Sequence, residues 1–409
     1  MQSSETTLTL STHHFNILML TIFATGALMV FHNNHNYGIM TLPSKESGPG
    51  SWSIEDRERF YLGIAGKGDN ATLPAAASAT RNATTWRLLP CAESFADLQW
   101  DKPMCFTPKL GLLIRKGKLS PNGTFQYVNA RAQRDENLAN CWNWAVEMAK
   151  KARAPIAYKA GDGINPVGFL SGVRAAGQRD RTAVIGRKPT NWDPPDLWKR
   201  SVKGDLPFDA KPDAIVWRGA TTGGRKGNYH VNPRDHQRAN LVRRIPVLRE
   251  KNASIYDIAV SHYVQGVRPG MFGPEDPLPE VAVLNRGKMV AMAQGNDVAT
   301  GLKAALWSSS AVVMPRPTFS SWLGEEKLEA WVHYVPVAQD FSDLEERVAW
   351  CLAPTHRDDC RAIGRNGRLW MDSFSDTAVE DRLQASVARR AARGARQLGL
   401  CACGSRFST

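Results

Sequence analysis

The order of strand-like and helical segments in the second half of the chain most constrains the fold. Residues 288–293 and 310–315 are short, apolar runs typical of buried strands, and residues 298–308 between them have a helical pattern. A strand, a helix and a second strand in this order form a parallel pair with a right-handed crossover. We therefore expect an α/β protein, and ligands of such sheets bind beyond the carboxyl ends of the strands.

A glycine-rich loop follows another expected strand at residues 213–217. Its glycines let backbone N–H groups approach an anionic ligand closely, and its first residue, Arg218, brings positive charge. The residues that we expect to bind a ligand here are Arg218, Gly219, Thr221 and Thr222. The alternative interpretation is an ordinary basic surface turn.

The expected helix at residues 298–308 offers a second anion site. Free N–H groups at a helix start suit phosphate, and Asn296 or Asp297 is the expected N-cap. Thr300 and Gly301 lie in the first turn, and Lys303 follows with a positive charge. A simply capped helix is the alternative. The two sites support each other, since both lie at strand-to-helix turns of one sheet.

The segments before and between these sites are less regular. Residues 138–150 and 233–249 have helical patterns, although Pro246 should kink or end the second helix early. Residues 155–158 form an expected strand, and an aspartate between glycines, Asp162, lies in a loop shortly after it. Residues 188–212 are rich in proline and are typical of an interdomain connection.

The N-terminus carries the compartment signal. The run from Phe15 to Phe31 is uncharged and largely apolar, at the short end of the roughly 17–25 residues that a membrane-spanning helix needs. We expect an uncleaved signal anchor; a cleaved signal peptide and a buried helix are the alternatives. Glycosylation sequons begin at Asn70, Asn82, Asn122 and Asn252.

Composition narrows the environment and the ligand. The chain has 409 residues, enough for two domains, and 7 cysteines, which suit an oxidising lumen with some disulfides and at least one unpaired thiol. Cys351 and Cys360 are close enough in sequence to close a short loop; buried free thiols are the alternative. The net charge is +13, yet the chain has no zinc-finger, RNP-like or basic-zipper pattern. We expect a diphosphate-bearing substrate and no nucleic acid; a solvated positive face is the alternative.

Several motifs in order resemble the CAP10-type glycosyltransferases, the family-90 group. The resemblance covers roughly residues 155–376. It rests on the following strings of the chain: Trp217-Arg218-Gly219-Ala220-Thr221-Thr222-Gly223, Asn232-Pro233-Arg234, Gly295-Asn296-Asp297-Val298-Ala299-Thr300-Gly301-Leu302-Lys303, Pro317-Thr318-Phe319, Trp331-Val332-His333-Tyr334-Val335-Pro336-Val337, and Phe341-Ser342-Asp343-Leu344.

The resemblance implies a GT-B-like fold, with two facing Rossmann-like domains and a cleft between them. It implies transfer of glucose or xylose from a UDP-sugar to a hydroxyl acceptor on a protein or glycan, with inversion. Asp162 resembles the family's acidic base, Arg218 and Lys303 would meet the diphosphate, and Arg234 would join the donor site. Some relatives have arginine at the position of Lys303. A lysine keeps the positive charge but cannot donate the two parallel hydrogen bonds of a guanidinium. Some also have an acid near Ser320 and Ser321.

These observations give one expected organisation. Residues 1–50 are the anchor and stem, 51–205 the acceptor and base domain, 206–375 the nucleotide-sugar domain, and 376–409 a C-terminal helix and basic tail. The sequence lacks an Asp-x-Asp motif, so we expect no metal and no cofactor. The expected location is the secretory lumen, at a Golgi or ER membrane as a single-pass type II protein, held by residues 15–31. Two alternatives stay open: a non-catalytic lumenal binding protein with this fold, and a transferase acting on lipid-linked or cell-envelope saccharides.

Overall fold

The computed structural model describes residues 19–23, 26–33, 36–41, 52–62, 89, 91–92, 103–109, 118–119, 125–126, 130–159, 169–176, 184–187, 199–200, 202–223, 236–401 and 403. The chain divides into two compact units, Met1–Ser51 and Trp52–Thr409. The predicted domain boundaries stay predictions.

The first unit contains strands where a membrane helix was expected. Its three antiparallel strands are β1 (Met19–Phe23), β2 (Gly26–Asn33) and β3 (Asn36–Thr41), and β2 lies between the other two. β-branched and aromatic residues in the run favour strands, and Gly26 is a poor helix former. Among the described residues, no helix has the length and the apolar character that crossing a membrane requires.

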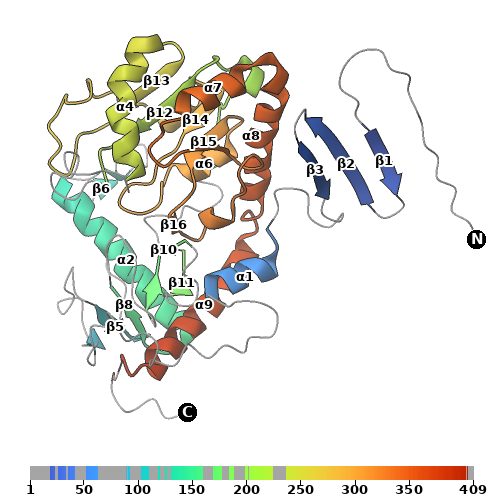
Figure 1. Ribbon diagram of the computed structural model, residues 1–409. Coiled ribbons are helices and arrows are strands. Elements are labelled where there is room, and N and C mark those ends of the chain that lie inside the picture. The colour runs from blue at the N-terminus through green and yellow to red at the C-terminus, as the bar shows by residue number, and fades with distance from the viewer. Residues whose placement is uncertain are drawn as a thin grey trace, which may run out of the picture. The chain divides into compact units, whose positions relative to one another are not determined.

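A parallel five-stranded sheet forms the centre of the C-terminal half (Figure 1). All neighbours in it run parallel, which confirms the expected strand–helix–strand unit. The strands, in spatial order, are β13 (Tyr256–Val260), β12 (Ile215–Gly219), β14 (Met289–Ala291), β15 (Ala311–Pro315) and β17 (Val335–Val337).

Alternate residues of these strands face two different hydrophobic clusters. Ile215 and Trp217 pack with residues of α4 and α7, whereas Val216 between them packs in the cluster that holds α6 and the end of α8. Side chains of a strand alternate between faces, so helices cover both sides of this sheet. The helices of this half are α4 (Gln237–Asn252), α5 (Glu280–Leu284), α6 (Leu302–Trp307), α7 (Leu344–Leu352) and α8 (Arg357–Asp372), with single 3₁₀ turns at Phe208–Ala210, Glu325–Lys327 and Pro354–His356.

Two helix predictions need correction. α4 does not end at Pro246 but continues to Asn252. The proline cannot bond to the carbonyl of Val242, yet Ile245 and Leu248 on either side of it are buried in the core and hold the helix. α6 begins at Leu302 and not at Val298. Val298 is buried in the segment that precedes the helix.

The N-terminal half has its own five-stranded sheet, which is mixed. β5 and β8 are antiparallel, and the remaining neighbours are parallel, so the half is only partly Rossmann-like. Its strands, in spatial order, are β11 (Val184–Ile185), β9 (Leu170–Ser171), β8 (Ile156–Tyr158), β5 (Met104–Phe106) and β4 (Cys91–Ala92). A separate hairpin pairs β6 (Lys118–Leu119) with β7 (Phe125–Gln126).

Three helices and a small ladder bind the two halves into one unit. α2 (Ala130–Ala152) lies against α9 (Thr377–Gln397), which returns from the C-terminal half to contact β8 (Figure 1). α1 (Ile54–Leu62) also packs on α9, where Arg57 and Glu380 form a buried ion pair. β10 (Arg174–Ala175) pairs antiparallel with β16 (Phe319–Ser320), one strand from each half.

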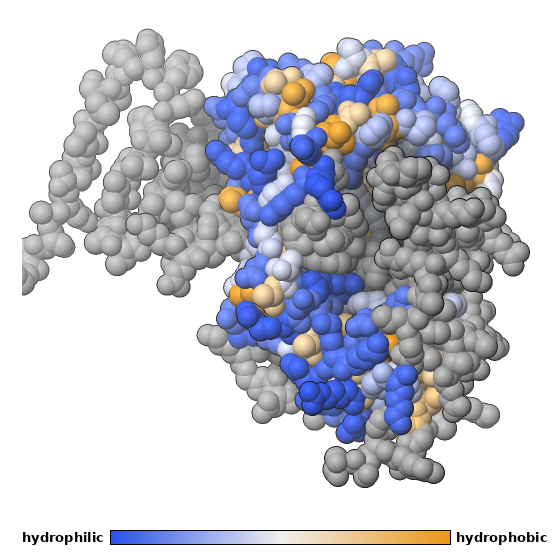
Figure 2. Space-filling model, turned by 180° about the vertical axis from the view of Figure 1, so that it is seen from behind, coloured by the Kyte–Doolittle hydropathy of each residue, from blue (hydrophilic) through white to orange (hydrophobic). Residues whose placement is uncertain are grey.

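Disulfides close the chain at two places. Cys91 bonds to Cys403 and Cys105 to Cys401, so the end of the chain is fixed to the β4–β5 edge. Cys351–Cys360 confirms the predicted short loop, and Cys141 is buried and forms no disulfide. Figure 2 shows a mainly hydrophilic described surface on the face that it presents, with hydrophobic residues scattered across it.

Candidate active site

The loops that follow β12 and β14 touch each other at the carboxyl edge of the parallel sheet. The Gly223 N–H donates to Asn296 Oδ1 at 2.9 Å and to Gln265 Oε1 at 3.1 Å. Gly223 has a φ of +96°, and a Cβ there would lie 3.1 Å from the Gly295 carbonyl carbon. A Cβ on Gly295 would lie 2.6 Å from Thr222 Oγ1. Glycine at both positions allows the two loops to approach this closely.

Arg238, which the sequence did not single out, and Thr221, which it did, hold these loops. Arg238 of α4 donates to Thr222 Oγ1, and its Nη2 donates to the Ala293 carbonyl at 2.9 Å. Thr221 is fully buried and exchanges two hydrogen bonds with the Val264 backbone, at 2.8 and 3.0 Å. The basic composition of residues 233–249 was the only signal for Arg238. The loops are therefore fixed in place by the fold.

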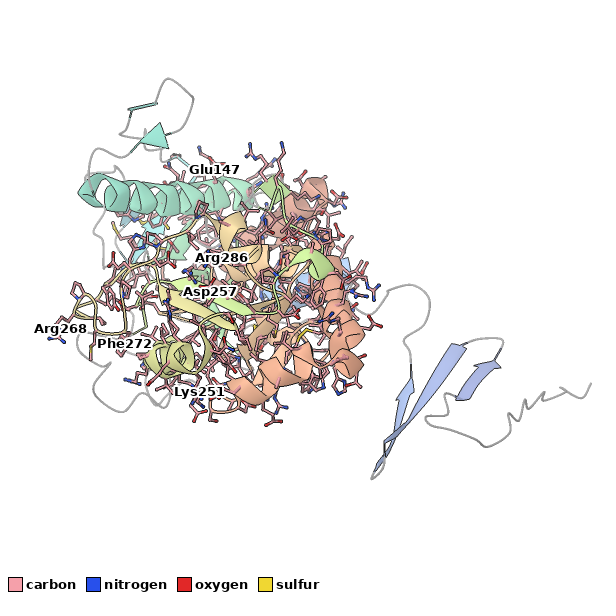
Figure 3. All side chains as sticks on the ribbon, turned by 90° about the horizontal axis from the view of Figure 1, so that it is seen from above. Glu147, Lys251, Asp257, Arg268, Phe272 and Arg286 are labelled. Atoms are coloured by element: carbon pink, nitrogen blue, oxygen red, sulfur yellow. A yellow bond between two sulfur atoms is a disulfide. The ribbon has the colours of Figure 1, made fainter. Side chains whose placement is uncertain are left out.

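Arg218 lies in an ion-pair network. Its side chain is 3% exposed, and Nη2 donates to Asp257 Oδ1 at 2.7 Å and to Asp276 Oδ2 at 2.6 Å. Arg286 pairs with the other oxygen of Asp257, and Figure 3 shows these two side chains next to each other. Burial alone would raise the pKa of Asp257, but the bonds from Arg286 and Arg218 outweigh it and lower that pKa. This guanidinium is thus already neutralised by carboxylates.

The residues around the expected helix start adopt different roles from those predicted. The N-cap of α6 is Gly301, and no side chain caps it. Asn296 lies too far before Leu302 to cap the helix, and its Oδ1 accepts from Gly223 and Gln265 instead. Asp297 is 6% exposed, Thr300 is exposed, and Lys303 is half-buried in the first turn of α6. The predicted donor-binding positions Gly219, Thr222, Asn296 and Thr300 are accessible at this edge.

A buried carboxyl group lies below these loops. Glu325 is 1% exposed and accepts hydrogen bonds from the Ser321 N–H at 2.6 Å and the Ser321 hydroxyl at 2.8 Å. Burial raises its pKa to about 7, and the charge of Asp297 contributes in the same direction. The buried carboxyl group of Glu325 thus bonds to Ser321, in the segment where some relatives carry an acid.

A glutamine network positions the segment that carries β16. The Gln294 Oε1 accepts from the Thr318 N–H at 2.8 Å and the Phe319 N–H at 3.1 Å, and Gln237 Oε1 accepts from the Gln294 N–H at 3.1 Å. Gln294 thus joins the end of β14 to the Pro317-Thr318-Phe319 motif. Gln294 directly precedes Gly295 of the predicted loop, and this position is the sequence feature that could have identified it.

His333 supports the chain before β17. Its Nδ1 accepts from the Glu329 N–H at 3.0 Å, and its ring stands edge-on to Trp370 at 5.1 Å. Burial lowers its pKa to about 4, so it is neutral at physiological pH. This geometry favours a bracing role.

Asp162, the predicted base, and Arg234, a predicted donor contact, lie outside the described residues. Both stay predictions. Among the residues that the structure describes, no group of three or more His, Cys, Asp or Glu side chains has an arrangement that would hold a metal ion.

Comparison with known proteins confirms the predicted resemblance over part of the chain. Residues 286–381 match the model of the family described as glycosyl transferase family 90. An O-glucosyltransferase, LpsA, of Dichelobacter nodosus is 29% identical over 43% of this chain and 48% of its own length.

Two viral relatives are also similar to parts of the chain. An uncharacterized protein, 035R, of Invertebrate iridescent virus 3 is 25% identical over 43% of this chain and 16% of its own length. Another, 027R, of Frog virus 3 is 34% identical over 28% of this chain and 14% of its own length. The chain thus spans about half the length of the first relative and much less of the viral ones. The family match and the relative from Dichelobacter nodosus support a glycosyltransferase.

Proposed function

Because residues 286–381 are a glycosyl transferase family 90 region, we propose that this protein transfers glucose from UDP-glucose to a hydroxyl group of a protein or glycan. The relative from Dichelobacter nodosus is named an O-glucosyltransferase, which favours glucose over xylose. The observation that carries the proposal is the contact between Gly223 and Asn296, which joins two glycine-bearing loops beyond the carboxyl ends of β12 and β14.

The donor diphosphate would lie on this pair of loops. Thr222, Asn296 and Thr300 offer polar groups there, and Lys303 offers the positive charge that a departing diphosphate needs. Arg218 would support the first of these loops, since its pair with Asp257 joins β12 to β13. Arg234 would add a second charge from the motif that follows the glycine loop.

The proposed mechanism is inversion with one base. Asp162 would take the proton from the acceptor hydroxyl while that oxygen attacks the anomeric carbon from the face opposite the diphosphate. The bond from this carbon to the diphosphate oxygen breaks in the same step, and UDP leaves. We propose that side-chain charge replaces a metal, because the sequence lacks an Asp-x-Asp motif.

Compartment and topology are part of the proposal. The three disulfides support an oxidising compartment, because such bonds persist in secreted and lumenal proteins. We place the enzyme in the secretory lumen, at a Golgi or ER membrane, as expected from the sequence.

A donor screen tests the proposal. UDP release is measured with a panel of UDP- and GDP-sugars, with and without EDTA, for the wild type and for Asp162→Asn. We expect UDP-glucose to be used in the presence of EDTA, and Asp162→Asn to bind donor normally but turn over about 100-fold more slowly.

Three results would count against it. Near wild-type turnover in Asp162→Asn would place the base elsewhere. Loss of turnover with EDTA and recovery with manganese would make the enzyme metal-dependent. Donor binding without release of any nucleotide would favour the non-catalytic binding protein.

A further inference from the structure

An open cavity of about 420 Å³ lies where α7, α8 and the turn before β17 meet, away from the loops described above. Its walls are Trp331, Trp350, Asp359, Ala362, Ile363 and Asn366. Trp331 precedes β17, so the cavity lies at the amino ends of the strands. The loops that follow β12 and β14, called the donor loops below, lie at the carboxyl ends. The volume lies within the range of about 300–1,000 Å³ that small-molecule sites occupy.

The two tryptophans form an exposed aromatic corner. Trp331 is 43% exposed, and its ring stands edge-on to that of Trp350 at 4.8 Å. Arg347 lies over the Trp331 ring at 5.4 Å, and His356 stacks on Trp350 at 4.8 Å. Each ring is thus held by a neighbour while the corner between them stays open to a ligand. A rigid aromatic surface with a polar rim suits the apolar C–H face of a pyranose ring.

The backbone at Trp331 adopts a strained conformation. Trp331 has a φ of +66°, a conformation that bulky residues rarely adopt. Three bonds fix the turn: Trp331 N–H to the Tyr334 carbonyl at 2.8 Å, His333 N–H to the Glu329 carbonyl at 2.9 Å, and Asn366 Nδ2 to the Val332 carbonyl at 3.0 Å. Strain that the surrounding structure maintains is a reason to look for a functional role.

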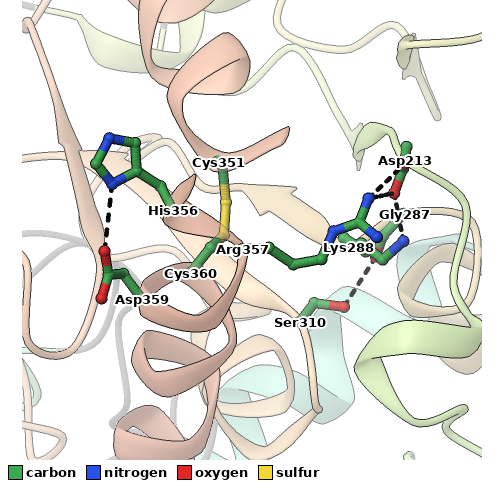
Figure 4. The surroundings of a disulfide bond; sticks show 9 residues. All are labelled: Asp213, Gly287, Lys288, Ser310, Cys351, His356, Arg357, Asp359 and Cys360. Atoms are coloured by element: carbon green, nitrogen blue, oxygen red, sulfur yellow. Dashed lines mark hydrogen bonds and ion pairs between the residues drawn. A yellow bond between two sulfur atoms is a disulfide. The ribbon is translucent and has the colours of Figure 1, made fainter. Parts of the chain in front are cut away.

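Polar groups complete the cavity. Asp359 Oδ2 lies 3.3 Å from His356 Nδ1, and the Asp359 side chain is 65% exposed, so carboxylate oxygen is available to a hydroxyl pair. Asn366 uses its Nδ2 on Val332, which directs its amide oxygen away from that bond. The Cys351–Cys360 disulfide joins α7 to α8 close to His356 and Asp359, as Figure 4 shows.

We propose that this cavity is a second saccharide-binding site, distinct from the donor site, for a neutral sugar with equatorial hydroxyl groups. Trp331 and Trp350 would receive the C–H face, and Asp359 and Asn366 would accept from hydroxyls at its edge. The carboxylate of Asp359 disfavours an anionic sugar. Because the site lies at the opposite end of the strands from the donor loops, it would hold a part of the acceptor or product glycan that does not react.

Binding of cellobiose tests the proposal without requiring turnover. Saturation-transfer NMR and calorimetric titration are performed on the full chain, with glucuronic acid as the anionic comparison. We expect saturable cellobiose binding that excess UDP does not displace, and weaker binding of glucuronic acid. Asp359→Ala should weaken cellobiose binding by about tenfold or more, since a hydrogen bond to a charged group is lost. Trp331→Ala should abolish saturable binding of cellobiose.

A matched variant controls for effects on the helix. Asp358 adjoins Asp359 in the first turn of α8, but it pairs with Arg361 and does not line the cavity. Asp358→Ala should therefore bind cellobiose as the wild type does. The proposal is overturned if the wild type shows no saturable binding, if Asp358→Ala and Asp359→Ala are equally weakened, or if UDP displaces the sugar. These outcomes are independent of whether UDP-glucose is turned over.

Discussion

Two positively charged residues near the donor loops differ in their surroundings, and the difference is testable. Removing Arg218 leaves Asp257 with one partner fewer in a mostly buried place, so we expect Arg218→Ala to lower the free energy of unfolding by about 3 kcal/mol. Lys303 is half-buried near the accessible edge. We expect Lys303→Ala to weaken donor binding by about 1.5–3 kcal/mol, because a charged contact to the diphosphate is lost.

Denaturant unfolding and calorimetric titration with UDP separate the two effects. If Arg218→Ala unfolds like the wild type while losing donor affinity, its guanidinium meets the diphosphate directly, as the sequence predicted.

Glu325 gives the protein a pH-dependent stability. Its pKa rises from 4.5 to about 7 on folding because the carboxyl is buried. As the pH rises from about 4.5 to 7, the unfolded chain releases this proton and the folded chain retains it, so the contribution of Glu325 becomes destabilising, by on the order of 3 kcal/mol above pH 7. Glu325→Gln removes this dependence and keeps the shape.

We therefore expect Glu325→Gln to be more stable than the wild type at pH 8 and to lose that advantage at pH 5. Urea unfolding at both values measures it, and Glu326→Gln, the adjacent and less buried acid, is the control. An advantage of Glu325→Gln that is the same at both pH values would mean that Glu325 is ionised in the folded protein throughout.

At the scale of elements, the end of the chain and the β4–β5 edge are joined twice. Cys91–Cys403 and Cys105–Cys401 span 312 and 296 residues of sequence. Once one bond exists, the other closes a loop of only about 15 residues, which is worth about 3 kcal/mol in the chain-entropy model. Losing both also frees a loop of nearly the whole domain, worth about 5 kcal/mol more.

In urea unfolding, the free energy of unfolding should therefore fall much less in Cys401→Ser or Cys403→Ser alone than in the double variant. Cys141→Ala is the control, since this cysteine forms no disulfide. A double variant no less stable than either single variant would show that this edge unfolds separately from the rest.

For the whole molecule, the proposed lumenal location predicts a glycan at Asn252. The residue is exposed at the end of α4, and its Oδ1 accepts from the Ser254 hydroxyl at 2.6 Å, so the sequon lies open on the surface. In a eukaryotic secretory host we expect a glycosidase mobility shift. Ser254→Ala should reduce this shift by one glycan, and Ser254→Thr should retain it. Full retention of the shift in Ser254→Ala would exclude Asn252 as an acceptor.

Local pattern alone predicted three strands of the parallel sheet, the glycine-bearing loops after two of them and the short disulfide. Buried strands at 213–217, 288–293 and 310–315 read as apolar runs because both faces of the sheet are covered, and glycines mark loops that must approach each other. Contacts between residues far apart in the sequence could not be predicted, because no local pattern encodes them. The pairing of Arg218 with Asp257, the burial of Glu325 and the late start of α6 depend on which loops the fold places side by side. The cavity between Trp331 and Asp359 likewise exists only because α7, α8 and the β17 turn meet.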